Sequence, residues 1–123
     1  CSQPVSLLDV YPTLTNFCGL PPSPHVEGLS LGPQLKDRLT PRQRPAITSS
    51  YYGNHAGRSE HWRLIRYEDG QQELYDHRHD PDELKNLASD PRHVGVIKRL
   101  SAWLPSAAAP EFKQKSERQR RSR

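Results

Sequence analysis

The chain has 123 residues and twelve prolines, and 33% of its residues are hydrophobic and 7% aromatic. A chain of this length and composition holds one small domain at most and buries only a modest core. The net charge is +4, and residues 111–123 alone carry six basic and two acidic side chains. The charges of the remaining residues therefore balance. This part of the chain shows no excess of positive charge of the kind that a nucleic-acid-binding domain carries.

The N-terminal part of the chain predicts one helix followed by a long loop. Residues 9–18 carry apolar side chains at helical spacing, and Ser6 or Asp9 can cap the N-terminus of this helix. A glycine and two prolines after it prevent the helix from continuing. Residues 20–44 are rich in proline and glycine, which is typical of a loop, with a short helical turn expected at 33–36.

The middle of the chain predicts extended structure. Residues 45–52 are rich in strand-forming side chains, and residues 61–67 and 72–76 read as two strands. The short turn between these two strands contains a glycine, so we expect an antiparallel hairpin over 61–76. Residues 53–58 are expected to be a loop that connects two extended segments.

The last part of the chain predicts helices. Asp80 precedes a proline and is expected to start a helix, and a second Asp-Pro pair starts an amphipathic helix over 90–104. Neither this helix nor the hairpin 61–76 can bury its apolar face alone, so we expect one to lie across the other. Trp62 and Trp103 are expected in the shared core. The predicted fold class is α+β.

The cysteines and the apolar runs exclude several classes of protein. Cys1 and Cys18 form no C-x-x-C motif, which excludes a zinc ribbon or a thioredoxin-type site. No apolar run approaches the roughly 18–20 residues of a membrane span. The sequence has no methionine and starts with a cysteine, so we expect a fragment of a longer protein.

Three segments carry a resemblance to a known family. They are PVSLLDVYPTLTNFCGLP (4–21), VEGLSLGPQLKD (26–37) and RPAITSSYYGNHAGRSEHWRLIRYEDGQQELYDHRHDPDELKNLASDP (44–91). In this order they resemble the C-terminal region of sulfatases, specifically bacterial enzymes similar to iduronate-2-sulfatase in the alkaline-phosphatase-like superfamily. Leu29 departs from the family pattern, in which we expect an arginine.

The resemblance implies a division of the chain into three parts. Residues 1–40 would be the tail end of the N-terminal α/β sulfatase domain, including its last helix. Residues 41–105 would form the C-terminal subdomain, a small antiparallel sheet packed by a helix. Residues 106–123 are expected to be a disordered basic tail, because their composition shifts to alanine, proline and charge.

The resemblance also implies a function, hydrolysis of sulfate esters on sulfated carbohydrates. Family members use a formylglycine, made from the first residue of a C-x-P-S-R signature, together with calcium. That signature is missing, since Cys1 is followed by Ser2-Gln3-Pro4. We therefore expect no catalytic residue and no metal site in this chain, and a full-length enzyme in which a further N-terminal domain supplies both. Such an enzyme is expected in the periplasm or outside the cell.

Two stretches hold candidate site residues. Asn54, His55 and Arg58 lie between glycines and could bind an anionic sugar, so we predict them as substrate-binding residues. Residues 76–80 contain two histidines and two aspartates, a set that can bind zinc. However, the aspartates are expected to serve as turn and cap residues, so no metal is predicted there.

Three further expectations stay open at this point. In an oxidising compartment Cys1 and Cys18 could form a disulfide, and otherwise Cys18 would be a helix residue without a covalent partner. The first alternative function is a phosphodiesterase or phosphonate hydrolase of the same superfamily. The second is a small basic protein that binds nucleic acid or heparin through residues 111–123.

Overall fold

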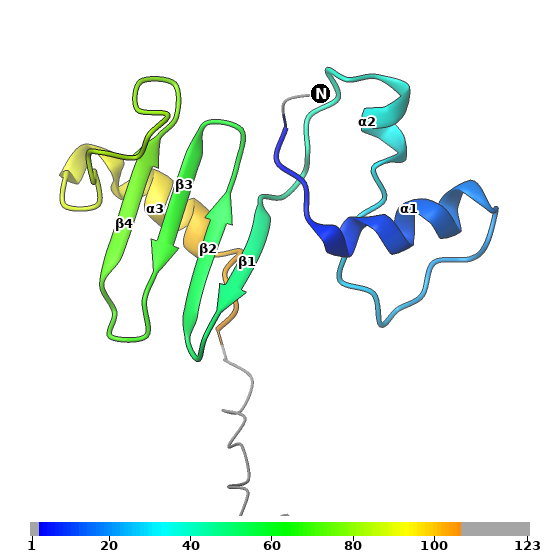
Figure 1. The fold of residues 1–123 in the computed structure, drawn as a ribbon, viewed down its shortest axis with the longest axis horizontal. Helices are drawn as coiled ribbons and strands as arrows, with labels where there is room; N and C mark the ends of the chain where they lie inside the picture. The colour runs from blue at the N-terminus through cyan, green and yellow to red at the C-terminus, as the bar shows by residue number, and fades with distance from the viewer. Residues whose placement is uncertain (1–2, 107–123) are drawn as a thin grey trace, which may run out of the picture.

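A four-stranded antiparallel sheet forms the centre of the computed structural model, which describes residues 3–106 (Figure 1). Its strands follow the chain in the order β1-β2-β3-β4, so each strand pairs with the next. Their bounds are Ala46–Ser50 for β1, Asn54–Arg58 for β2, Trp62–Arg66 for β3 and Gln72–Asp76 for β4. The hairpin predicted over 61–76 is therefore confirmed as β3 and β4.

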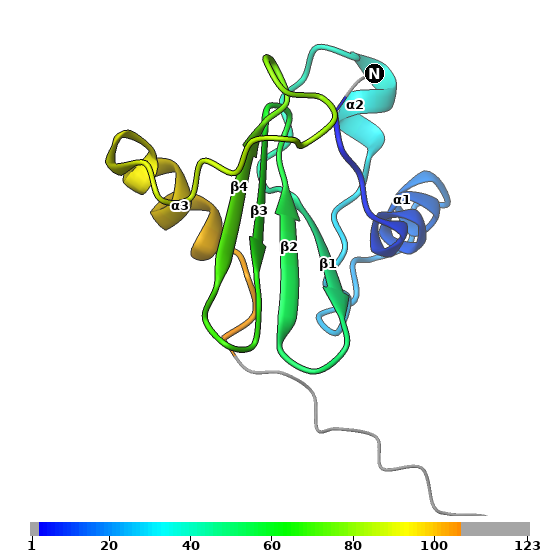
Figure 2. The ribbon, with the colours of Figure 1, turned by 60° about the vertical axis from the view of Figure 1, so that its left-hand side comes forward.

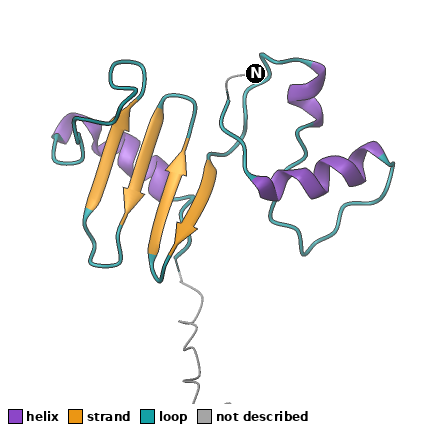
Figure 3. Cartoon of the chain, viewed as in Figure 1, coloured by secondary structure: helices purple, strands orange, loops and turns teal. Residues whose placement is uncertain are grey.

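The C-terminal helix covers one face of this sheet, as Figure 3 shows. A 3-10 turn, η2 (Pro91–His93), leads into α3 (Val94–Ser101), and the carboxylate of Asp90 caps the turn by accepting from the backbone N–H of Arg92. The core between sheet and helix consists of five side chains: Trp62, Leu64, Leu74, Leu100 and Leu104. The predicted α+β fold, a sheet packed by a helix, is confirmed.

The segment after α3 packs closely against a glycine of β2. Gly57 pairs with Leu64, which in turn pairs with Leu74 across the next strand. A Cβ atom at Gly57 would lie 3.2 Å from Cδ2 of Leu104, tighter than an ordinary packing contact. A side chain at this position would therefore require Leu104 to shift by a few tenths of an ångström.

The N-terminal lobe is held together by one buried carboxylate. It contains η1 (Leu7–Asp9), α1 (Val10–Phe17) and α2 (Gly32–Lys36). Asp9 is fully buried and accepts hydrogen bonds from the backbone N–H groups of Ser6 at 2.8 Å and Leu29 at 2.9 Å. Ser6 and Asp9 thus form a capping box at the start of η1, where the sequence had predicted one of the two as a helix cap.

The two lobes lie side by side. Figure 2 shows the sheet nearly edge-on, with α3 on one side and α1 and α2 on the other. A short linker over residues 41–45 joins the N-terminal lobe to β1 (Figure 1). The division of the chain into domains at residue 40 stays a prediction.

The structure corrects two local predictions. Residues 54–58 are not a loop but the inner strand β2, and the turn before it uses two positive φ angles, 53° at Tyr51 and 78° at Gly53. Asp80 does not start a helix. Its carboxylate accepts from the backbone N–H groups of Leu84 and Lys85, both at 2.9 Å, and so closes a turn in the connection that leaves β4.

A large apolar surface remains uncovered on the N-terminal lobe. Side chains of η1 and α1 and of the segment after them are about half exposed or more: Leu7, Leu8, Val10, Tyr11, Leu14, Phe17 and Leu20. Trp103 is also half exposed, which corrects its predicted place in the core. Within residues 3–106 no helix is long and apolar enough to cross a membrane. Cys1 and the predicted tail beyond residue 106 lie outside the described residues.

Candidate functional site

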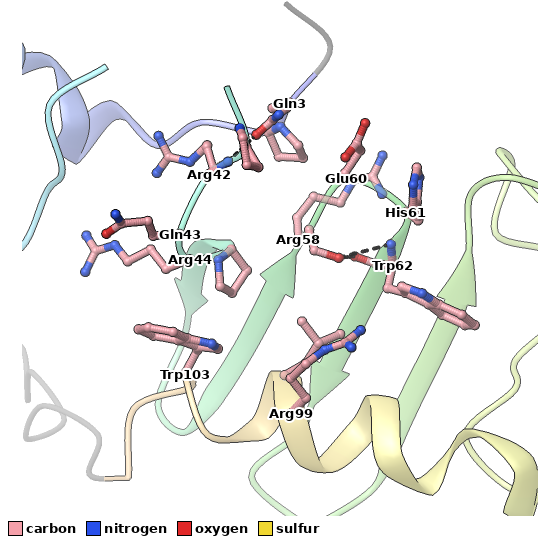
Figure 4. Close-up of a pocket in the computed structure, with 15 residues that line it drawn as sticks. Gln3, Arg42, Gln43, Arg44, Arg58, Glu60, His61, Trp62, Arg99 and Trp103 are labelled. Atoms are coloured by element: carbon pink, nitrogen blue, oxygen red, sulfur yellow. Dashed lines mark hydrogen bonds between the residues drawn. The ribbon is translucent and has the colours of Figure 1, made fainter. Parts of the chain in front are cut away.

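A basic pocket lies where the linker between the lobes meets the sheet and the end of α3 (Figure 4). Its volume is about 290 Å³. Its walls come from residues 41–45, residues 58–62, and a segment at the end of α3. Four arginines line it, and we call it the arginine pocket: Arg42, Arg44, Arg58 and Arg99.

Distant parts of the chain place these arginines. Arg58 is the last residue of β2, and Arg99 stands on α3. Arg42 and Arg44 lie on the linker, whose prolines favour an extended path. In Figure 4, Arg99 rises from α3 towards the sheet, Arg58 lies beside Glu60 and His61, and Arg44 lies next to Trp103. The pocket thus exists only in the folded chain.

Two of the arginines are fixed by the N-terminal lobe. Nη2 of Arg42 lies 2.9 Å from Oδ2 of Asp9, and both side chains are almost fully buried. Nη2 of Arg44 donates to the backbone carbonyl of Glu27. These contacts hold the linker in place, because they anchor it to the lobe on either side of its central residue.

Two guanidinium nitrogens at the pocket are buried without a hydrogen-bond partner among the described residues. They are Nε of Arg42 and Nη1 of Arg58. Burial lowers the pKa of Arg58, an effect that Glu83 opposes and Arg63 reinforces. An arginine keeps its positive charge at neutral pH in spite of such a shift. Two of the four arginines that line the pocket thus carry a buried N–H group without an acceptor among the described residues.

The two tryptophans have different surroundings. Trp62 is buried in the core, with the guanidinium carbon of Arg78 5.2 Å from its ring centre and the ring of His93 at the same separation. Both tryptophans line the pocket, but Trp103 is 48% exposed. Trp62 therefore acts as a packing residue, whereas Trp103 presents an aromatic surface that a ligand can reach.

The three predicted substrate-binding residues lie on one strand but not at one site. Of Asn54, His55 and Arg58, only Arg58 lines the arginine pocket. Asn54 lies at the other end of β2, about 13 Å away for a strand of this length. Its Oδ1 accepts from the backbone N–H of Glu68 at 3.0 Å. A substrate contact by Asn54 therefore stays a prediction without support from this geometry.

His55 occupies a buried position that the sequence did not predict. It is 6% exposed, and its Nδ1 lies 2.8 Å from Oγ of Ser49 on the neighbouring strand. It is two residues from Gly57, so its side chain points to the same face of the sheet, the face that the segment after α3 covers. The expectation of an exposed loop residue was wrong, and the substrate role of His55 stays a prediction.

The acidic and histidine-rich stretch 76–80 forms internal ion pairs. Asp76 accepts from Nε of Arg78 at 2.8 Å and from its Nη2 at 2.6 Å, and these hydrogen bonds lower the pKa of Asp76. His77 lies 2.7 Å from Glu83, which also pairs with Arg63. In residues 3–106 no three His, Cys, Asp or Glu side chains come together in an arrangement that could hold a metal ion.

Three of the four arginines, Arg42, Arg44 and Arg99, were not predicted from the sequence as site residues, and the exposed position of Trp103 at the pocket was not predicted either. The signal for two of them was the run Pro-Arg-Gln-Arg-Pro over 41–45, in which prolines flank a pair of cations. Such a run predicts an extended, positively charged linker. The sequence around Arg99 does not indicate a place in the pocket, because a helical pattern does not show which exposed cation will lie near a distant loop.

The arrangement of strands and helix, with this sequence, matches a known family. A sequence model described as the C-terminal part of N-sulphoglucosamine sulphohydrolase matches residues 1–109. The chain belongs to this family. It therefore corresponds to the C-terminal region of a sulfatase, and the resemblance seen in the sequence is confirmed.

Individual relatives agree with this assignment. The chain is 36% identical over 106 residues to a sulfatase from Formosa agariphila, with 86% of this chain and 21% of the relative covered. It is 33% identical over 102 residues to human arylsulfatase K, with 71% and 19% covered. It is 30% identical over 106 residues to a delta 4,5-hexuronate-2-O-sulfatase from Bacteroides thetaiotaomicron, with 79% and 22% covered. The chain thus spans about a fifth of the length of these curated relatives.

Solved structures share the fold. A 2-O GAG sulfatase matches with a TM-score of 0.58 and 29% identity, over 76% of this chain and 22% of that protein. A phosphonate monoester hydrolase from Agrobacterium radiobacter matches with a TM-score of 0.59 at 23% identity, over 76% and 23% of the two chains. The second likeness shows only that the same subdomain fold occurs in another hydrolase.

Proposed function

We propose that this chain is the C-terminal part of a sulfuric ester hydrolase that acts on sulfated carbohydrates. The observation that carries the proposal is the family match over residues 1–109, because it extends over all the residues that the structure describes. Relatives named for sulfatase activity, one of them a hexuronate-2-O-sulfatase, support it. The arginine pocket adds a chemical reason, since guanidinium groups bind sulfate and carboxylate oxygens.

The described chain contributes binding and packing, not bond cleavage. Calcium, which the family resemblance implies, finds no group of three metal-ligand side chains among the described residues. The C-x-P-S-R signature that yields formylglycine is missing from this chain. We derive no step through either group and expect the rest of the enzyme to hold both. The residues of this chain that could touch an anionic substrate are those of the arginine pocket, and they can hold and orient it.

The uncovered apolar surface of the N-terminal lobe supports a partner within the same protein. Leu14 and Phe17 on α1 are both more than half exposed, and they belong to a continuous group of exposed apolar side chains. Apolar surfaces of this kind mark interfaces. We infer that α1 packs against the remaining sulfatase domain, which the sequence analysis expected as the partner of this chain.

We infer that the complete enzyme is located in the periplasm or is secreted. Such a compartment would allow Cys18, which is exposed after α1, to form a disulfide with Cys1. Mass spectrometry of the non-reduced protein tests this. A mass lower by two hydrogens supports the pair, and alkylation of both thiols without reduction excludes it.

The coding sequence upstream of Cys1 tests the proposed class. A sulfatase requires an open frame that encodes the C-x-P-S-R signature, in which the first residue becomes the nucleophile. A threonine nucleophile with zinc-type ligands there would instead indicate a phosphodiesterase or phosphonate hydrolase, the alternative that shares the fold. The isolated 123-residue chain is expected to hydrolyse neither ester, because it lacks the signature.

A further inference from the structure

We propose that the arginine pocket is a subsite for a second acidic group of a sulfated oligosaccharide, separate from the sulfate ester that is hydrolysed. The group would be a sulfate or a uronate carboxylate on a neighbouring sugar, and both present oxygens that accept from guanidinium. The proposal rests on the proposed function, since it assumes a sulfated carbohydrate as substrate. It assigns to this segment a role in substrate selection.

Two arginines that line the pocket carry donors without acceptors among the described residues. Nε of Arg42 and Nη1 of Arg58 are buried, and neither has a hydrogen-bond partner in the described chain. Buried donors without acceptors cost free energy, so such groups normally meet water or a ligand. Both residues line the same pocket, and an oxyanion there would offer several acceptor oxygens at once.

The residues that line the pocket carry more positive than negative charge. Four of them are arginines and one, Glu60, is acidic. Asp9 compensates only Arg42, and Arg44 is bound to a neutral carbonyl group. Arg99 is exposed on α3 and makes no ion pair with any described residue, so it is available to a ligand. A surplus of positive charge in a small concave site favours an anion.

An aromatic side chain accompanies the arginines at the pocket. Trp103 lines the pocket together with Arg44 and is 48% exposed (Figure 4). An exposed indole next to a cation suits a ligand with an apolar ring face and an acidic substituent, and a sugar acid or sugar sulfate has both. The volume of about 290 Å³ is at the lower end for a small-molecule site and fits one substituted ring rather than a long chain.

The experiment measures binding of a heparin-derived tetrasaccharide to the 123-residue chain by calorimetry at fixed salt. All variants carry a tail whose six basic residues within 111–123 are changed to glutamine, because a basic tail binds polyanions by itself. Arg99→Ala and Trp103→Ala remove exposed side chains of the pocket. Lys98→Ala is the matched control, since Lys98 is the exposed cation next to Arg99 but does not line the pocket.

We expect Arg99→Ala to weaken binding by about tenfold, the scale of one charge-assisted hydrogen bond, and Lys98→Ala to change it by less than about twofold. Trp103→Ala should weaken binding of the tetrasaccharide but not that of inorganic sulfate. Arg58→Gln, with its fold verified by circular dichroism, should also weaken binding. A chemically desulfated tetrasaccharide separates the two oxyanions: retained affinity indicates the carboxylate, and lost affinity indicates the sulfate.

Several outcomes would overturn the proposal. One is an equal loss of tetrasaccharide affinity from Arg99→Ala and from Lys98→Ala. Another is the absence of any tetrasaccharide binding once the tail is neutralised. A third is that single-stranded DNA binds as tightly as the tetrasaccharide and that Trp103→Ala leaves this DNA binding unchanged. The result is independent of catalysis, because the chain tested lacks the nucleophile signature. Failure of the complete enzyme to release sulfate would therefore refute the proposed function, whereas failure of the tetrasaccharide to discriminate these variants would refute the subsite alone.

Discussion

Asp9 and Arg42 form a buried ion pair that connects the N-terminal lobe to the linker of the arginine pocket. Oδ2 of Asp9 lies 2.9 Å from Nη2 of Arg42, and the two side chains are 0% and 7% exposed. The same carboxylate accepts from the backbone N–H groups of Ser6 and Leu29. A single side chain thus fixes the start of η1, the loop after α1 and the position of an arginine in the pocket.

Replacing Asp9 by alanine should unfold the N-terminal lobe. The change leaves the guanidinium of Arg42 buried without its counter-charge, and removing one partner of a buried pair costs about 3–5 kcal/mol. Amide hydrogen exchange is the measurement, and the N–H groups of Leu29 and Leu31 should lose protection while those of β3 keep it. Asp37→Ala, at an exposed position, is the control and should leave both regions unchanged.

His55 should contribute to stability through its contact with Ser49. The Ser49 Oγ and His55 Nδ1 atoms are 2.8 Å apart, and the imidazole is buried. We expect His55→Ala to lower the free energy of unfolding by about 1–3 kcal/mol, because a buried hydrogen bond and packed volume are lost. A double-mutant cycle with Ser49→Ala measures the coupling. Fully additive effects would show that the hydrogen bond contributes nothing.

The ion pair of Asp76 and Arg78 should make stability depend on pH at the acidic end. Hydrogen bonds from Arg78 hold the folded-state pKa of Asp76 below its unfolded value of about 3.9. The stabilisation is therefore present above that value and is lost as the pH falls through the folded-state pKa. Melting temperatures between pH 6 and pH 2 measure this dependence.

In that series, Asp76→Asn should flatten the decrease at low pH and lower the melting temperature at pH 6. Asp82→Asn is the matched control, because Asp82 is exposed in the following connection. If both variants follow the parent protein over the whole range, the ion pair of Asp76 does not contribute to acid stability.

The exposed apolar surface of α1 should matter differently in the isolated chain and in the complete enzyme. Changing Leu14 and Phe17 to glutamate should reduce aggregation of the isolated chain, because both side chains are exposed there. In the complete enzyme the same changes should lower the melting temperature by several degrees, since they would place charges in an interface. Leu35→Glu on α2 is the control, and an equal effect from it would contradict a specific contact through α1.

The sequence predicted the elements whose signals are local. Strands β3 and β4 were found because a glycine-containing turn joins two runs of aromatic and branched residues, and α3 because its apolar residues follow a helical period. Strand β2 was missed because Asn54–Arg58 is polar and contains glycine, and its extended form depends on pairing with β1 and β3.

The arginine pocket could not be predicted from the sequence, because it too depends on contacts between distant parts of the chain. Arg42 and Arg99 are far apart in the chain and meet at one pocket only after the linker, the sheet and α3 have packed. The helix start predicted at Asp80 failed because an aspartate before proline caps a turn as well as a helix, and here the turn brings Leu87 back to pair with Leu74 of β4 at 2.8 Å. Local patterns do not distinguish these outcomes.

The most direct test of the account is the release of inorganic sulfate by the complete protein that contains this segment. Ion chromatography would follow sulfate from a sulfated glycosaminoglycan disaccharide, with a phosphonate monoester and a phosphodiester as competing substrates. We predict release of sulfate, and no release by a variant whose signature cysteine or serine is changed to alanine. Hydrolysis of the phosphonate or the phosphodiester without release of sulfate would contradict the assignment.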